Sequence, residues 1–171
     1  MKNAEEEAKL LTEAFLKMEN MGDLFINLFI VGFLAAFAEE LMFRGVIQRL
    51  LSDWIKNKHL AIWIAALIFS AFHFQFYGFI PRMVLGALLG YLFMWSGSLW
   101  LPILAHFINN ATAVIVQYLI VKGNISADIE KIGENNELTF LIPSVFIVLI
   151  LLFYLKRLSS QNIPSSSEGF L

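Results

Sequence analysis

The feature that most constrains this chain is a series of five apolar stretches whose lengths suit a helix that crosses a bilayer. Of the 171 residues, 58% are hydrophobic and 15% are charged, whereas a soluble domain has about a quarter charged residues. A soluble domain of this size has too much surface to hide so many apolar side chains. We therefore predict an all-α, polytopic transmembrane helical bundle, integral to a cell membrane. The expected spans are approximately residues 24–51, 60–74, 79–95, 99–121 and 138–155.

The two ends of the chain are more polar than its middle. In residues 4–21, apolar side chains recur on one helical stripe among Glu and Lys, which predicts an amphipathic helix on the bilayer surface or across the end of the bundle. The serine-rich C-terminal tail is typical of disorder. We accordingly divide the chain into an amphipathic helix (1–22), a transmembrane domain (23–157) and a disordered tail (158–171).

Basic residues near the ends of the spans predict an orientation. Arg49, Lys56 and Lys58 follow the first span, and Lys156 and Arg157 follow the fifth. With five spans these two groups lie on the same side, and an excess of Lys and Arg marks the cytoplasmic side, so we expect a cytoplasmic C-terminus. A net charge of −2 gives no indication of nucleic-acid binding. The absence of cysteine excludes disulfides, thiolate metal sites and a cysteine nucleophile.

Three charged residues interrupt the first span. A charged side chain at the middle of a bilayer costs about 2.5 to 3.5 kcal/mol on insertion scales, so such residues need a structural or chemical reason. Glu40 and Arg44 are four residues apart and share a helical face, where they can pair. Glu39 points roughly 100° away, so it does not share that partner and could face a cavity as a general base. The alternative is one ion-pair network that only joins helices.

Two further spans each carry a histidine in a pair of residues with the same four-residue spacing. Phe69 and His73 lie one turn apart in the second span, and His106 and Asn110 lie one turn apart in the fourth. An imidazole and an amide that donate hydrogen bonds into a cavity could form an oxyanion hole. The alternative for each is a hydrogen bond between helices, and Asn109 competes with Asn110 for the role.

Other chemistries of intramembrane hydrolysis lack their residues here. The HExxH motif of zinc metalloproteases is absent. Ser96 and Ser98 fall in a loop, without the glycine-flanked serine and intramembrane base that a rhomboid protease needs. An aspartyl dyad is excluded because every aspartate lies at a span edge or in a loop. These aspartates are Asp23, Asp53 and Asp128.

Taken together, the three motifs resemble the signature of the CAAX protease and bacteriocin-processing family, which includes the type II CAAX prenyl endopeptidases and the Abi-type bacterial proteins. The flanking sequences FRG at 43–45 and LPILAH at 101–106 agree with it. The resemblance covers about residues 35–115. The motifs are EExxxR at Glu39, Glu40 and Arg44, FxxxH at Phe69 and His73, and HxxxN at His106 and Asn110.

The resemblance implies an intramembrane endopeptidase that hydrolyses peptide bonds with water activated by glutamate and histidine. Glu39 would act as the general base, assisted by His73. His106 and Asn110 would stabilise the oxyanion of the tetrahedral intermediate. The expected partners are a peptide or lipidated protein substrate and the lipid bilayer, and the resemblance to bacterial proteins leads us to expect a bacterial cell membrane.

Within the same resemblance, Glu40 and Arg44 would hold the site together, and a direct role for Glu40 is the alternative. The family is often labelled metalloprotease. Glu and His could ligate zinc, but no ligand spacing demands it, so we expect no metal and no other cofactor. The prenyl-protease members resemble an eight-helix bundle with the glutamate motif on its fourth helix. We therefore expect this chain to lack about three N-terminal helices.

Two other functions fit the same residues. The first is a noncatalytic membrane protein that gives bacteriocin immunity or acts as a scaffold for a partner. The second is a small transporter whose intramembrane polar groups bind an ion. Substrate cleavage distinguishes the protease from both.

Overall fold

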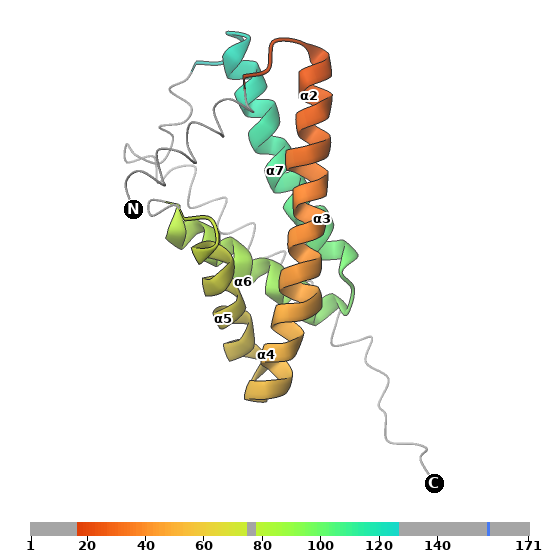
Figure 1. Cartoon of the computed structure of the whole chain (residues 1–171), viewed down its shortest axis with the longest axis vertical. Helices are drawn as coiled ribbons and strands as arrows, with labels where there is room; N and C mark the ends of the chain where they lie inside the picture. The colour runs from red at the N-terminus through yellow and green to blue at the C-terminus, as the bar shows by residue number, and fades with distance from the viewer. Residues whose placement is uncertain (1–16, 75–77, 127–156, 158–171) are drawn as a thin grey trace. The chain divides into compact units, whose positions relative to one another are not determined.

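The computed structural model describes residues 17–74, 78–126 and 157, and the secondary structure in these residues is helical throughout, without β-strands. A long first helix runs without interruption from Met21 to Ile55. It is followed by α5 (Lys58–Ala71), α6 (Phe79–Ser96) and α7 (Trp100–Val121). Packing joins α7 to the first helix and α5 to α6 (Figure 1). The predicted all-α fold is confirmed for these residues.

The first helix begins at a capping box. The side chain of Asn20 accepts a hydrogen bond from the backbone N–H of Asp23, and the Asp23 carboxylate accepts one from the backbone N–H of Asn20. Such reciprocal bonds satisfy N–H groups that have no partner inside a helix. The helix ends at Lys56, whose φ of 57° is left-handed. These two signals place its ends a few residues outside the predicted span of 24–51.

Two segments of the first helix are π-helical. The consecutive parts are α2 (Met21–Asn27), η1 (Leu28–Leu34), α3 (Ala35–Glu40), η2 (Leu41–Ile47) and α4 (Gln48–Ile55), where η denotes a π-helix. Short π-helical segments occur frequently at functional sites. Here they flank α3, which ends with both glutamates of the sequence motif.

Close approaches between backbones bring the helices together around α3. A Cβ atom on Gly32 of η1 would lie 3.3 Å from the ring of Phe107 on α7, so the glycine lets these helices approach closely. On the other side, α5 and α6 share an apolar core of small and branched residues. Its buried members are Ile62, Ala66 and Ala87.

The membrane spans agree only in part with the prediction. Three helices are long and apolar enough to cross a bilayer: 21–55, 79–96 and 100–121. Helix α5 is apolar but has 14 residues, which is about 21 Å at 1.5 Å per residue, shorter than the roughly 30 Å hydrocarbon core. The fifth expected span and residues 4–16 of the expected amphipathic helix lie outside the described residues. The count of five spans stays a prediction.

The chain divides into two compact units, residues 1–126 and 127–171. All the helices described above belong to the first unit, which also holds every residue of the three sequence motifs.

Candidate active site

The predicted pairing of Glu40 with Arg44 is present and buried. Arg44 Nη1 donates to Glu40 Oε1 at 2.7 Å, and both side chains are almost fully excluded from solvent. The second guanidinium nitrogen, Nη2, donates to the backbone carbonyl of Gly86 on α6 at 2.7 Å. The arginine thus joins the glutamate of its own helix to a neighbouring helix.

Gln48 extends this contact by one more turn. Its side-chain amide donates to the carbonyl of Gly90 at 3.1 Å, so Arg44 and Gln48 contact α6 carbonyls that are also four residues apart. Glycine is needed at the second carbonyl, because a Cβ atom on Gly90 would lie 2.9 Å from both Gln48 Oε1 and Ile62 Cγ2. The sequence motifs did not reveal this anchoring of the first helix on α6. The spacing of Gly86 and Gly90 is the signal that could have revealed it.

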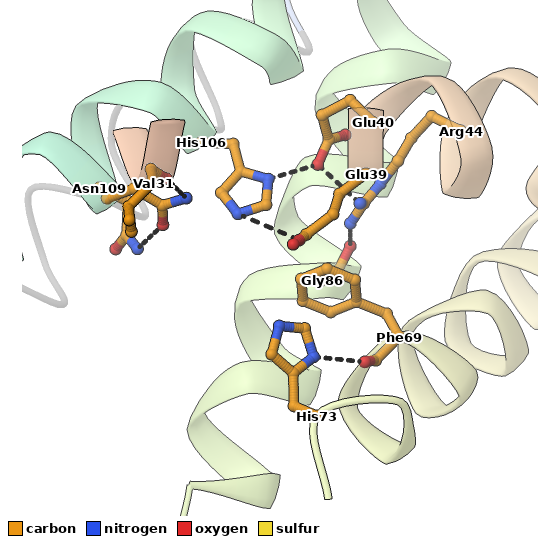
Figure 2. A network of polar contacts seen from close by, with 10 residues as sticks. Val31, Glu39, Glu40, Arg44, Phe69, His73, Gly86, His106 and Asn109 are labelled. Carbon is orange, nitrogen blue, oxygen red and sulfur yellow. Dashed lines mark hydrogen bonds and ion pairs between the residues drawn. The ribbon is translucent and has the colours of Figure 1, made fainter. Parts of the chain in front are cut away.

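His106 lies between the two glutamates (Figure 2). Its Nδ1 is 2.8 Å from Glu40 Oε1, and its Nε2 is 3.7 Å from Glu39 Oε2. The Glu40 carboxylate is paired with Arg44, and an ionised carboxylate only accepts hydrogen bonds. The ring nitrogen Nδ1 must therefore carry the proton and donate the hydrogen bond. The buried imidazole of α7 is therefore held by the ion pair of the first helix.

Glu39 has different surroundings from Glu40. Its side chain is 29% exposed, whereas that of Glu40 is 0% exposed. Glu39 Oε2 is nevertheless buried, and it has no hydrogen-bond partner among the described residues; the same holds for Glu40 Oε2. Buried polar atoms in native proteins are nearly always bonded, so an exception calls for a functional or structural explanation.

The ring of Phe69 occupies the centre of the cluster. Its centroid lies 5.1 Å from Cζ of Arg44 and 5.8 Å from the His106 ring. The His73 ring packs against it at 4.9 Å, and that of Phe43 at 5.0 Å. An aromatic face that contacts a guanidinium stabilises the cation. The sequence motif included Phe69 without indicating that it contacts all of these groups.

His73 reaches the cluster through Phe69. It lies just beyond the end of α5, and its Nδ1 is 2.9 Å from the carbonyl oxygen of Phe69. Because a carbonyl only accepts, this nitrogen carries the proton, which leaves Nε2 of the neutral ring as an acceptor. No direct bond joins His73 to Glu39 or His106 in the described part of the chain.

Asn110 lies one turn beyond His106 on α7, but the two side chains are not bonded to each other. Asn110 Nδ2 donates to the carbonyl of Val31 in η1 at 3.2 Å. Its Oδ1 accepts from Asn109, which is exposed. The amide of Asn110 therefore links α7 to η1, the interhelical bond that the sequence left open as the alternative.

The structure thus brings Glu39, Glu40, Arg44 and His106 into direct contact. His73 and Asn110 lie at opposite edges of this group. Among the described residues, no set of three or more His, Asp or Glu side chains is placed to hold a metal ion. The Glu40 carboxylate is already engaged by a guanidinium, which repels a divalent cation.

The family model described as type II CAAX prenyl endopeptidase, Rce1-like, matches residues 21–112. The match covers more than half of the chain, and it runs from the first residue of α2 into α7. The chain belongs to this family. The matched residues include every residue of the three motifs.

The chain is 42% identical, over 82 residues, to the uncharacterized protein YpbD of Bacillus subtilis (strain 168). The aligned part covers 46% of this chain and 39% of the length of that protein. No solved structure matches the chain significantly.

Proposed function

We propose that this member of the Rce1-like family is an endopeptidase that hydrolyses peptide bonds within the membrane, using a water molecule activated by Glu39. The observation that carries the proposal is the contrast between adjacent glutamates. Glu40 Oε1 is hydrogen-bonded to Arg44 and His106 and its side chain is fully buried, whereas the Glu39 side chain is 29% exposed and, among the described residues, its Oε2 has only the longer 3.7 Å contact with His106 Nε2. Such an oxygen is available to accept a proton from water.

Charge balance in the cluster supports a role for His106 as a donor. Glu39, Glu40 and Arg44 together carry one net negative charge, and a buried net charge is costly. A proton on both nitrogens of His106 makes the cluster neutral. The Nε2–H would then lie beside Glu39, where it can donate to an oxygen that becomes negative during the reaction.

The proposed reaction conserves atoms and protons. Water attacks the carbonyl carbon of the scissile bond while Glu39 accepts a proton from it. The carbonyl oxygen becomes an oxyanion, which accepts a hydrogen bond from His106. The C–N bond then breaks, and Glu39 transfers its proton to the leaving amine.

His73 and Asn110 take supporting roles in this proposal. The acceptor nitrogen of His73 orients the attacking water and assists Glu39. Asn110 uses one amide hydrogen for the Val31 carbonyl, and the second is available for the oxyanion. Phe69 keeps the His73 ring in position and separates it from Arg44.

The proposed substrate is a hydrophobic or lipidated peptide segment, because the cluster lies in helices whose outer faces are apolar. The mechanism uses no metal. Treatment with EDTA should therefore leave the cleavage rate unchanged, and loss of activity that Zn²⁺ restores would contradict this part of the proposal.

Cleavage of a prenylated CAAX peptide in H₂¹⁸O tests the proposed function. The purified protein in nanodiscs should release the C-terminal fragment, and mass spectrometry should find one ¹⁸O atom in the new carboxyl group. Glu39→Ala should lower the rate by at least about a hundredfold, as expected for loss of a general base.

Glu19→Ala is the matched control, because this glutamate is exposed at the start of the chain's described part. It should cleave at the wild-type rate. Equal rates in Glu39→Ala and wild type would assign the cleavage to a contaminating protease. A folded wild-type protein that cleaves neither prenylated nor unmodified hydrophobic peptides would favour the noncatalytic function instead.

A further inference from the structure

A cavity with charged residues in its lining lies where α4 turns into α5. Its volume is about 320 Å³, within the range of about 300–1,000 Å³ that is typical of small-ligand sites. The lining comes from α4, α5, α6 and the residue after α6. The lining residues are Gln48, Arg49, Ser52, Asp53, Lys58, Phe93, Met94 and Gly97.

We propose that this cavity binds the phosphate group of a phospholipid. Gln48 belongs to both regions, but the basic residue Arg49 follows Glu40 by nine residues, which is about 13 Å along a helix. The proposal does not depend on the proposed hydrolysis.

Two basic residues, Arg49 and Lys58, give the cavity an anion-binding chemistry. Arg49 packs its guanidinium over the ring of Phe93 at 5.1 Å, which fixes the plane of the group and leaves its edge N–H atoms free to donate. Neither Arg49 nor Lys58 forms an ion pair with any described carboxylate. Two unpaired cations beside the Ser52 hydroxyl suit the oxygens of a phosphate. Asp53 is the one acidic group in the lining, so the net lining charge is positive.

The position of the cavity along the spans also fits a lipid headgroup. Two helices of spanning length, 21–55 and 79–96, end beside this cavity, and the ends of spans lie at the depth of lipid headgroups. Basic pockets between transmembrane helices at this depth recognise anionic headgroups.

Two exposed apolar residues next to lining residues of the cavity favour a lipid over a free phosphate ion. Trp54 follows Asp53 in the chain and is 88% exposed, and Leu50 follows Arg49 and is 64% exposed. An exposed tryptophan is typical of the membrane interface, and an exposed leucine next to a bound phosphate can contact an acyl chain. Both features fit a phosphate that is attached to a lipid.

Native mass spectrometry of the full chain in a nonionic detergent tests the proposal, with dihexanoyl phosphatidylglycerol as the probe. Binding should be saturable, and Arg49→Gln and Lys58→Gln should each weaken it by about fivefold, since one basic residue near anionic lipid contributes about 1 kcal/mol. Asp53→Asn removes the acidic residue and should tighten binding. This opposite change cannot result from unfolding.

Lys56→Gln is the matched control, because Lys56 lies in the same turn and is exposed but does not line the cavity. It should change the affinity by less than about twofold, as expected for screened surface charge. An equal loss in Lys56→Gln would show a diffuse surface effect and overturn the proposal. Displacement of the lipid by an equal concentration of inorganic phosphate would show a free-anion site instead. Equal binding of dihexanoyl glycerol, which has no phosphate, would also overturn the proposal.

Discussion

Two halves of the candidate site differ in how completely their polar groups are bonded. The anchored half consists of Glu40, Arg44 and Gln48, with the α6 carbonyls that the latter two contact. The open half consists of Glu39 and His73, which have no bond to each other and face the anchored half through His106 and the ring of Phe69. The boundary between the two halves falls between Glu39 and Glu40, which are adjacent residues of the first helix.

The comparison shows how one short motif can separate stability from chemistry. In the anchored half, each charge has a partner of opposite sign or a carbonyl, so its groups hold the first helix against α6. In the open half, the Glu39 carboxylate is 29% exposed and, among the described residues, has only a 3.7 Å contact with His106, so it remains able to accept a proton from water. Variants that affect the halves differently can sharpen this distinction or break it.

The largest effect on stability is expected for Arg44→Met. It leaves the buried Glu40 carboxylate without its cation, and breaking a buried ion pair in this way costs about 3–5 kcal/mol. Unfolding in detergent by sodium dodecyl sulfate, followed by circular dichroism, measures the loss. The double variant Glu40→Gln/Arg44→Met removes both charges and should be less destabilised than Arg44→Met. A single variant as stable as wild type would show that the anchored half does not hold the helices.

His73→Ala should act on activity and leave stability nearly unchanged. We expect at least about a hundredfold fall in the cleavage rate, within the range for loss of an acid–base group. The free energy of unfolding should change by less than about 1 kcal/mol, because the half-buried ring contacts mainly Phe69. Equal losses of activity and stability would remove the distinction between the halves.

Gly86→Ala tests the close contact between α6 and α5 beside the carbonyl that accepts from Arg44. A Cβ atom there would lie 3.1 Å from the Phe69 ring and 3.3 Å from Ala66, and such overpacking costs about 1–3 kcal/mol. Gly45→Ala is the control, because its Cβ would meet Leu99 at an ordinary 3.6 Å. Thermal unfolding should separate the two variants. Similar stabilities would show that α5 and α6 can move apart at little cost.

The smallest effect is expected for Asn110→Ala. Losing one hydrogen bond between transmembrane helices costs about 0.6 to 1.7 kcal/mol, here the bond to the Val31 carbonyl. The neighbouring variant Asn109→Ala should change stability by less than about 0.5 kcal/mol, because this side chain is exposed. A fall in cleavage rate for Asn110→Ala alone, beyond its effect on stability, would support the proposed role at the oxyanion.

Much of this arrangement could be predicted from spacing along single helices. Residues four apart share a helical face, which correctly predicted that Glu40 would pair with Arg44 and that Glu39 would have a different environment. High apolar content correctly predicted a helical membrane protein. Assignment to the family also followed from the three motifs, whereas the catalytic roles of their residues stay predictions.

Contacts between helices could not be predicted in the same way. The sequence grouped His106 with Asn110, but His106 is bonded to Glu40 and Asn110 to a backbone carbonyl. The α6 carbonyls that accept from Arg44 and Gln48 have no side-chain signature except the glycines that allow the approach. The π-helical segments of the first helix also depend on packing and were not predicted.

The most direct test of the central claim compares Glu39→Gln with Glu40→Gln in a single-turnover cleavage assay, at a temperature where both variants are folded. Each variant removes one charge from adjacent residues and preserves the side-chain shape. Glu39→Gln should form no product although it unfolds at nearly the wild-type temperature, whereas Glu40→Gln should unfold at a lower temperature and retain measurable cleavage. Wild-type cleavage by Glu39→Gln would contradict the account.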